Sequence, residues 1–204
     1  MNPGGIVHLI DDDEAVRESL EMLLEASGFA VTPYASATAF LDRLDDAPCG
    51  CVITDVRMPE VSGLELLRRL SDRLAEFPVI VLTGEADVPM AVEALKNGAL
   101  DLIEKPYAAE AILSAVRLGL DRLEAHKLRT SRRGGAAQRL AALSAREREV
   151  LAGVVDGRAN KEIARDLGIS PRTVEAYRAS LMMKMEAESL SELVRMALDA
   201  EPPD

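Results

Sequence analysis

The sequence predicts an α/β domain with a parallel sheet, followed by an all-helical domain. Four short apolar runs, at residues 6–10, 51–54, 79–82 and 101–104, alternate with longer stretches. Runs of this length that are rich in Val and Ile are typical of buried strands. The stretches between them are long enough for helical crossovers, which make neighbouring strands parallel. Beyond residue 137 the sequence shows no strand pattern, so the remainder is predicted to be helical.

Local patterns place the other elements of the first domain. Residues 30–34 predict a fifth strand, and Pro33 places that strand at an edge of the sheet. Asp12 or Asp13 is suited to cap a helix that ends at Gly28. Four further helices are predicted, from Ser36 to about residue 46, from Ser62, over residues 87–96, and from near Ala108 past the end of the domain.

Charge divides the chain into two parts. Residues 1–124 carry 23 acidic and 10 basic side chains, whereas residues 125–178 carry 6 acidic and 12 basic ones. A locally basic part suggests contact with a polyanion, although ordinary solvated faces would give the same counts. Paired glycines within residues 131–137 predict a linker. We therefore expect a domain at 1–124, a helical extension and linker at 125–140, and a second domain at 141–204.

The overall composition predicts a soluble protein of the cytoplasm that does not enter the membrane. Hydrophobic residues make up 48% of the 204 residues, and no apolar run has the length needed to span a bilayer. The N-terminus lacks the pattern of a secretory leader. Cys49 and Cys51 have no second pair with which to form a zinc site, so Cys51 is interpreted as a core residue.

Polar residues stand where the predicted strands end. Asp11 and Asp12 follow the first run, Asp55 follows the second, Thr83 the third and Lys105 the fourth. Because the carboxyl ends of parallel strands meet at one edge of the sheet, where α/β domains bind ligands, we expect these side chains to share one crevice. A carboxylate such as that of Asp55 can accept a phosphoryl group as an acyl phosphate.

The same residues supply what phosphoryl transfer requires. The reaction depends on positioning and on neutralising charge, which a hard cation such as Mg²⁺ provides when carboxylate oxygens bind it. Asp11, Asp12 and Asp55 offer those carboxylates, Lys105 offers a positive charge and Thr83 a hydroxyl. The alternative is that the aspartates only form a helix cap and a solvated turn, but four such elements in order at four strand ends disfavour it.

These motifs resemble the receiver domain of two-component response regulators. The resemblance covers residues 5–124 and rests on Asp11-Asp12, residues 54–63, Thr83-Gly84 and Lys105-Pro106. It implies a five-strand, doubly wound parallel α/β domain of the flavodoxin-like type. It also implies that Asp55 is the phosphoacceptor, that Thr83 and Lys105 bind the phosphoryl group, and that Mg²⁺ is held by Asp12, Asp55 and the backbone carbonyl of Arg57, with Asp11 acting through water.

One position departs from the receiver pattern. Receivers usually carry an aromatic switch residue three positions before the lysine, and this chain has Leu102 there. The resemblance further implies that the helix after Thr83 and the following strand form a dimer surface, which here contains Val92, Lys96 and Asp101. The alternative is that Val92 belongs to the core and Lys96 is an ordinary surface charge.

The second domain carries a helix-turn-helix pattern. Ser144 and Glu147 form a capping box at the start of one helix. A short helix over residues 160–167 is followed by a turn at Gly168 and by a second helix, over residues 171–181, that Ser170 caps. A short helix, a glycine turn and a capped helix are typical of helix-turn-helix domains, and a plain helical hairpin is the alternative.

Residues 140–200 resemble the LuxR/FixJ-type four-helix DNA-binding domain, so the whole chain is similar to FixJ-family transcription factors. The resemblance rests on residues 146–151, 160–164 and 169–178. It implies base-reading positions at Glu175, Ala176 and Ala179, and phosphate contacts from Asn160, Lys161, Arg172, Thr173, Arg178 and Lys184. Glu175 itself either accepts from a cytosine amino group or favours the helix dipole as an N-terminal carboxylate.

The sequence therefore predicts a regulator of transcription rather than an enzyme. A sensor histidine kinase would phosphorylate Asp55, and the modified protein would form a homodimer that binds double-stranded promoter DNA. RNA polymerase is a further partner consistent with this role. One alternative is an aspartyl-phosphate phosphatase, but such enzymes usually place an acid two residues after the nucleophile, where this chain has Arg57. The other is a phosphorylation-independent DNA-binding regulator, which Leu102 leaves open.

Overall fold

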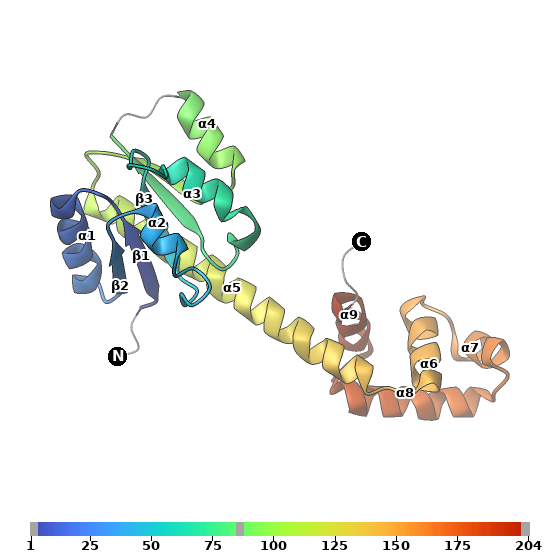
Figure 1. Cartoon of the computed structure of the whole chain (residues 1–204). Coiled ribbons are helices and arrows are strands. Elements are labelled where there is room, and N and C mark those ends of the chain that lie inside the picture. The colour runs from blue at the N-terminus through green and yellow to red at the C-terminus, as the bar shows by residue number, and fades with distance from the viewer. Residues whose placement is uncertain (1–3, 85–87, 201–204) are drawn as a thin grey trace. The chain divides into compact units, whose positions relative to one another are not determined.

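The computed structural model of the chain describes residues 4–84 and 88–200 (Figure 1). The chain divides into two compact units between His126 and Lys127, and each is described by itself below. Within the described residues, no helix combines the length and the apolar character needed to cross a membrane.

The first unit contains the predicted five-strand parallel sheet. The strands lie in the order β2-β1-β3-β4-β5, which is the flavodoxin-like order, and every neighbouring pair is parallel. Their bounds are β1 Ile6–Ile10, β2 Ala30–Tyr34, β3 Cys51–Asp55, β4 Val79–Thr83 and β5 Asp101–Glu104. The strand with Pro33 is at an edge, as predicted, and the central strands β3 and β4 are buried at every residue.

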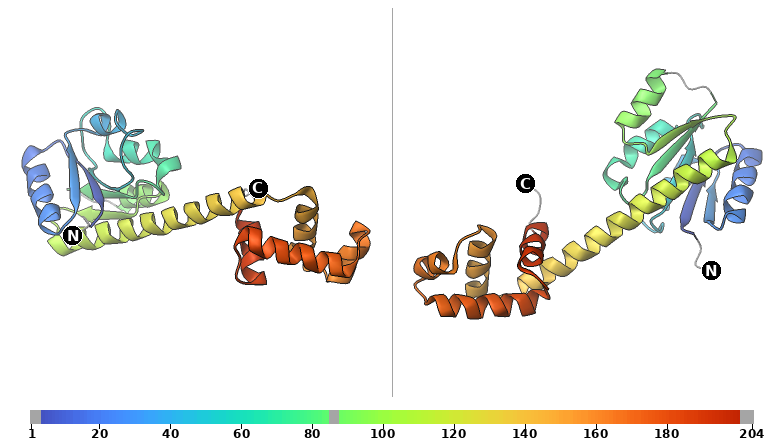
Figure 2. Two further views of the ribbon diagram at one scale, coloured as in Figure 1. Left: turned by 90° about the horizontal axis from the view of Figure 1, so that it is seen from below. Right: turned by 180° about the vertical axis from the view of Figure 1, so that it is seen from behind.

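Helices cover both faces of this sheet (Figures 1 and 2). Successive strand residues point to opposite faces, so Val52 packs with α2, α3 and α4 while Ile53 packs with α1 and α5. The helices of the first unit are α1 Glu14–Ala26, α2 Ala37–Leu41, α3 Gly63–Arg69, the short 3₁₀ helix η1 Ser71–Arg73, α4 Val88–Lys96 and the first part of α5 Ala109–Ala141. The doubly wound architecture is thereby confirmed.

Side-chain caps fix where these helices begin. Asp13 caps α1, and Ser36 and Ser62 cap α2 and α3 through their hydroxyl oxygens. Helix α2 is shorter than expected, because after Leu41 the backbone forms successive i→i+3 hydrogen bonds and continues as turns. Helix α4 was expected to begin at Asp87, which lies outside the described residues.

The expected linker at residues 131–137 is wrong. These residues are helical, and α5 continues without a break from Ala109 to Ala141. Glycine costs about 1 kcal/mol relative to alanine in a helix interior. Three features compensate for that cost. The flanking residues have good helix propensity, the side chain of Ala136 is buried, and Leu140 packs against the second unit's core.

Gly134 gives a direct test of this helix. A methyl group added there would meet no atom of the described residues within 4 Å. We expect Gly134→Ala to raise the free energy of unfolding by about 0.5–1 kcal/mol, because alanine loses less backbone entropy on forming a helix. Chemical denaturation followed by circular dichroism measures the change. A flexible linker at residues 131–137 would instead leave the unfolding free energy unchanged.

As far as residue 200, where the described part of the chain ends, the second unit contains four helices after the end of α5. They are α6 Ala145–Val155, α7 Asn160–Leu167, α8 Pro171–Met185 and α9 Leu190–Ala200. Val150, Ile163, Val174, Leu181 and Leu193 lie in one core that joins these four helices. The turn between α7 and α8 uses Gly168 at φ 65°, and Ser170 caps α8, so the predicted four-helix domain with a helix-turn-helix is confirmed.

Candidate functional site

A lysine joins two carboxylates at the carboxyl edge of the first unit's sheet. The Nζ atom of Lys105 lies 2.6 Å from an oxygen of Asp55 and 3.1 Å from an oxygen of Asp11. These residues follow or end β1, β3 and β5, which are separated in sequence but converge at this edge. The sequence predicted this convergence.

Backbone groups hold the two carboxylates in place. The N–H of Arg57 donates to Asp55 at 2.6 Å, and the N–H of Asp13 donates to Asp11 at 3.0 Å. The N–H of Lys105 donates to the carbonyl of Thr83 at 2.7 Å, which ties β5 to the end of β4. The Lys105–Pro106 peptide bond is cis. Each acidic side chain is therefore oriented by its own loop.

The charges of this cluster respond to burial and to one another. Burial raises the pKa of the Asp11 carboxyl, although hydrogen bonds from Asp13 and Lys105 act in the opposite direction. Burial alone would lower the pKa of Lys105, but its hydrogen bonds to Asp55 and Asp11 outweigh that effect and raise it. Lys105 is thus kept protonated beside two acidic groups.

The donor set of the crevice suits a hard cation. Asp11 and Asp55 are buried, while Asp12, the next residue after Asp11, is exposed. Among the described residues, no three His, Cys, Asp or Glu side chains are grouped closely enough to hold a metal ion by themselves. Mg²⁺ usually takes one or two protein carboxylates and completes its shell with water and phosphate oxygens, so this set of oxygens fits it.

Gly63 leaves room for the backbone of the predicted phosphoacceptor. A Cβ atom on Gly63 would lie 2.2 Å from the carbonyl oxygen of Asp55, and the N–H of Gly63 donates to the carbonyl of Val56. Only a residue without a side chain allows α3 to begin this close to the end of β3. The sequence shows this glycine, but only the structure shows what it faces.

We expect Gly63→Ala to disturb the site and the fold together. The added methyl group must push against a backbone carbonyl, which should lower the free energy of unfolding by about 1–3 kcal/mol. Chemical denaturation of both proteins measures this change, and Gly134→Ala serves as the matched glycine-to-alanine control. Unchanged stability of the Gly63 variant would contradict the close approach of α3 to Asp55.

Thr83 and Leu102 lie on the side of the crevice that faces α4. Thr83 is 1% exposed, and its hydroxyl donates to the sulfur of Met90 at 3.7 Å. Leu102 is partly buried and belongs, with Met90 and Ala94, to the core beneath α4. An aliphatic side chain therefore occupies the position where receivers usually carry an aromatic ring. The sequence did not indicate the contact between Thr83 and Met90.

The predicted dimer residues lie on α4 and β5 of the same unit. Val92 is 42% exposed, and Lys96 and Asp101 are also exposed. Val92 is therefore not a core residue, contrary to the alternative that placed it in the core.

The predicted DNA-contact residues lie on α7 and α8. Glu175, Ala176 and Ala179 are exposed on α8, on the side opposite the buried Val174 and Leu181. Among the predicted phosphate contacts, Lys161, Arg172, Thr173 and Lys184 are exposed, while Asn160 and Arg178 are half-buried. The guanidinium of Arg178 donates to the side-chain oxygen of Asn160 at 3.0 Å, which connects the two helices of the helix-turn-helix.

A buried carboxylate anchors α8 to α6. Glu147 is 4% exposed and accepts hydrogen bonds from the N–H of Ser144 and the hydroxyl of Ser180, each at 2.8 Å. The Nζ atom of Lys184 lies 2.8 Å from the same carboxylate. Lys184, predicted only as a phosphate contact, is therefore also part of an internal ion pair. The sequence predicted the capping box of Glu147 but not its contacts with α8.

The hydrogen bonds around the Glu147 carboxylate lead us to expect that the protein loses stability in acid. The hydrogen bonds that Glu147 accepts lower the pKa of its carboxyl from the usual 4.5 to about 2, and the bond from Lys184 has the largest effect. A carboxyl whose pKa is lower in the folded state stabilises the fold above the unfolded pKa, and that contribution is lost as the pH falls through the folded pKa. We expect Glu147→Gln to melt at a lower temperature than the wild type at neutral pH.

The pH dependence distinguishes this cluster from an ordinary surface ion pair. The difference in melting temperature between the wild type and Glu147→Gln should shrink as the pH falls from about 4.5 to about 2. Glu149→Gln is the control, because Glu149 is half-exposed on the same helix and pairs with Arg146 at 2.7 Å. Thermal melts followed by circular dichroism measure both. A constant difference across this range would rule out the buried carboxylate as its cause.

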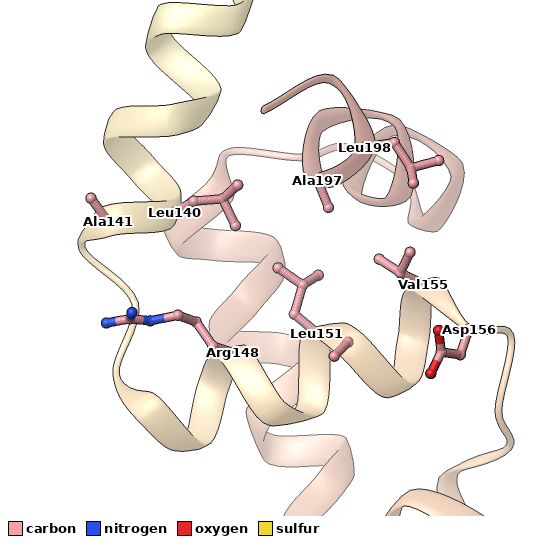
Figure 3. A pocket seen from close by; sticks show the side chains of 9 residues that line it. Leu140, Ala141, Arg148, Leu151, Val155, Asp156, Ala197 and Leu198 are labelled. Carbon is pink, nitrogen blue, oxygen red and sulfur yellow. The ribbon is translucent and has the colours of Figure 1, made fainter. Parts of the chain in front are cut away.

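The second unit also contains an apolar pocket away from α8. Its volume is about 650 Å³, and it lies between the end of α5, α6 and α9 (Figure 3). Leu140, Leu151, Val155 and Leu198 line it, with Arg148 and Asp156 among its polar residues. No α8 residue contributes to this lining, so the pocket is separate from the predicted DNA face.

Both units match known families of bacterial regulators. Residues 7–117 match the response regulator receiver domain, and residues 141–197 match the luxR family of bacterial regulatory proteins. The chain is therefore a two-component response regulator that controls transcription through a DNA-binding domain. Receiver domains generally use Mg²⁺ for their phosphorylation.

Relatives that match along nearly the whole chain place it within this class. The transcriptional regulatory protein FixJ of Azorhizobium caulinodans is 58% identical over 94% of this chain and 91% of its own length. FixJ of Rhizobium meliloti is 51% identical over 94% of both chains. The chain belongs to the FixJ family of transcriptional regulators. The prediction of a regulator rather than an enzyme is thereby confirmed.

Solved structures of two regulators have a similar fold. Full-length FixJ from B. japonicum aligns with a TM-score of 0.60 at 46% identity and covers 96% of this chain and 97% of its own. The response regulator StyR aligns with a TM-score of 0.79 at 34% identity and covers 95% of this chain and 98% of its own.

Proposed function

We propose that phosphorylation of Asp55 by a sensor histidine kinase switches this regulator to a form that binds promoter DNA tightly. An oxygen of the Asp55 carboxylate attacks the phosphorus atom, and the bond from phosphorus to the donor breaks. Lys105 neutralises charge on the phosphoryl oxygens, and the hydroxyl of Thr83 donates to one of them.

The observation that carries this proposal is the Lys105 ammonium between Asp11 and Asp55. A cation 2.6 Å from the acceptor carboxylate is positioned to neutralise the negative charge that a phosphoryl group brings. Asp11, Asp12, Asp55 and the backbone carbonyl of Arg57 would hold Mg²⁺, whose charge supports the same transfer.

The second unit supports the DNA-binding half of the proposal. Its exposed α8 face carries small and polar residues that fit a major groove, and Lys161, Arg172 and Thr173 lie near the start of α7 or α8, where they would contact phosphates. Arg178 and Lys184 hydrogen-bond within the unit to Asn160 and Glu147. Both side chains would also contact phosphates when the DNA backbone comes close to them. We place this activity in the bacterial cytoplasm, where a regulator of this family meets the chromosome.

The phosphorylated protein is proposed to act as a homodimer. Val92 and Lys96 are exposed one turn apart on α4, and Asp101 is exposed on the adjacent strand β5, so they can form one two-fold contact. A dimer presents two α8 helices to a two-fold promoter site. RNA polymerase is a further proposed partner of the DNA-bound dimer.

A comparison of phosphorylated and unmodified protein tests the proposal. Acetyl phosphate with Mg²⁺ should raise the apparent mass toward a dimer and tighten retention of promoter fragments, and removal of Mg²⁺ by a chelator should prevent both. Lys96→Glu should prevent both without preventing modification of Asp55. Equal DNA retention before and after phosphorylation would favour a phosphorylation-independent regulator instead.

A further inference from the structure

The hydroxyl of Thr83 contacts α4 in the structure. Its donor contact to the Met90 sulfur spans 3.7 Å and links the end of β4 to the first turn of α4. A thioether sulfur is a weak acceptor, much weaker than a carboxylate or a phosphoryl oxygen. The hydroxyl is therefore held toward α4 by a contact that a stronger acceptor can replace.

A phosphoryl group on Asp55 would be such an acceptor. It carries negative charge on several oxygens, and charge-assisted hydrogen bonds are roughly twice as strong as neutral ones. Thr83 ends β4, the strand next to β3, and follows Leu82, the residue that pairs with Asp55 in the sheet. Turning its hydroxyl from sulfur to phosphoryl oxygen would break the contact between the end of β4 and the Met90 sulfur.

We propose that Met90 is a positioning residue that holds the Thr83 hydroxyl toward α4 until Asp55 is phosphorylated. This inference rests on the proposed function of Asp55. Losing the contact changes the packing of the first turn of α4, the helix that also carries Val92 and Lys96. Met90 packs in the same core as Leu102, the residue at the position of the usual aromatic switch. Met90 would therefore couple the crevice to α4 in a chain that lacks the aromatic ring.

The competing interpretation is that Met90 only fills the core beneath α4. Methionine is suited to irregular gaps, and Met90 packs against the cluster that contains Ala94 and Val81. The two interpretations differ in one respect. A filler acts through its volume whatever residue 83 is, whereas a positioning residue acts only when residue 83 carries a hydroxyl.

A double-mutant cycle on the full chain separates them. Beryllofluoride with Mg²⁺ serves as the phosphoryl mimic, and ¹⁹F NMR measures the concentration at which half the protein is loaded. Met90→Leu removes the sulfur at similar volume, so it should lower that concentration by about two- to fivefold, the size expected from losing a weak hydrogen bond. In a Thr83→Val background the same change should have no effect.

Two controls make the result decisive. Met22→Leu alters a methionine that is 72% exposed on α1 and should leave half-loading unchanged. In ¹³C-methyl methionine spectra, the Met90 signal, assigned by its absence from Met90→Leu, should shift on loading of the wild type but not of Thr83→Val. An equal effect of Met90→Leu in both backgrounds, or no effect in either, would overturn the role of Met90 alone. A wild type that never loads would overturn the proposed function as well.

Discussion

Replacing Asp55 by Asn should abolish phosphorylation of this protein by acetyl phosphate or by a kinase. The carboxylate of Asp55 is the group that would form the acyl phosphate, and an uncharged amide cannot take its place as a nucleophile. The substitution also removes the charge that pairs with Lys105 at 2.6 Å, while the side chain keeps nearly the same size. The modified fraction, measured by intact-protein mass spectrometry, should fall from a detectable level to none.

The control for this experiment is Asp121→Asn. Asp121 is exposed on α5, so its loss changes the net charge equally without touching the crevice. This variant should accept the phosphoryl group as the wild type does. Full modification of Asp55→Asn would mean that another residue is the acceptor, and the role assigned to Asp55 would then be wrong.

Replacing Arg172 by Ala should weaken DNA binding across all sequences. Arg172 is exposed in the first turn of α8, where its guanidinium can reach a phosphate as the helix enters the groove. Each neutralised phosphate contributes about 0.9 to the slope of log affinity against log salt concentration, so the slope should become smaller by about one for each protomer that binds. Fluorescence anisotropy at several salt concentrations measures both the affinity and the slope.

Two other basic residues calibrate that result. Arg195→Ala removes an equal charge from the exposed surface of α9 and should leave the slope unchanged. Lys184→Ala should reduce the slope less than Arg172→Ala, because Lys184 already shares its charge with Glu147. A loss of affinity confined to one base position would identify Arg172 as a base-reading residue.

The strand ends explain why much of the candidate site could be predicted. The sheet has one carboxyl edge, so placing Asp11, Asp55 and Lys105 at strand ends was sufficient to bring them together once the topology was known. Side-chain contacts between different helices and strands could not be predicted in this way. The hydrogen bond from Thr83 to Met90 depends on how α4 packs, and nothing in the local sequence specifies that packing.

Two features that the sequence did not reveal have a similar physical cause. Gly134 and Gly135 have low intrinsic helix propensity, which favoured a linker, but the packing of Ala136 in the second unit overrides the local preference. Lys184 was predicted only as a phosphate contact, because 37 residues of sequence separate it from Glu147. Lys184 reaches Glu147 because α6 and α8 pack against each other in the fold.

The two sides of α8 separate core packing from the proposed recognition of DNA. Val174, Leu181 and Met185 are buried in the core, whereas Glu175, Ala176 and Ala179 point outward and support no core contact. Under the proposed base-reading role of these positions, we expect substitutions on the outward side to change which operator is bound while the domain keeps its melting temperature. A library randomised at those three positions would remain largely foldable, so promoter preference in this regulator is open to directed evolution without a prior search for compensating mutations.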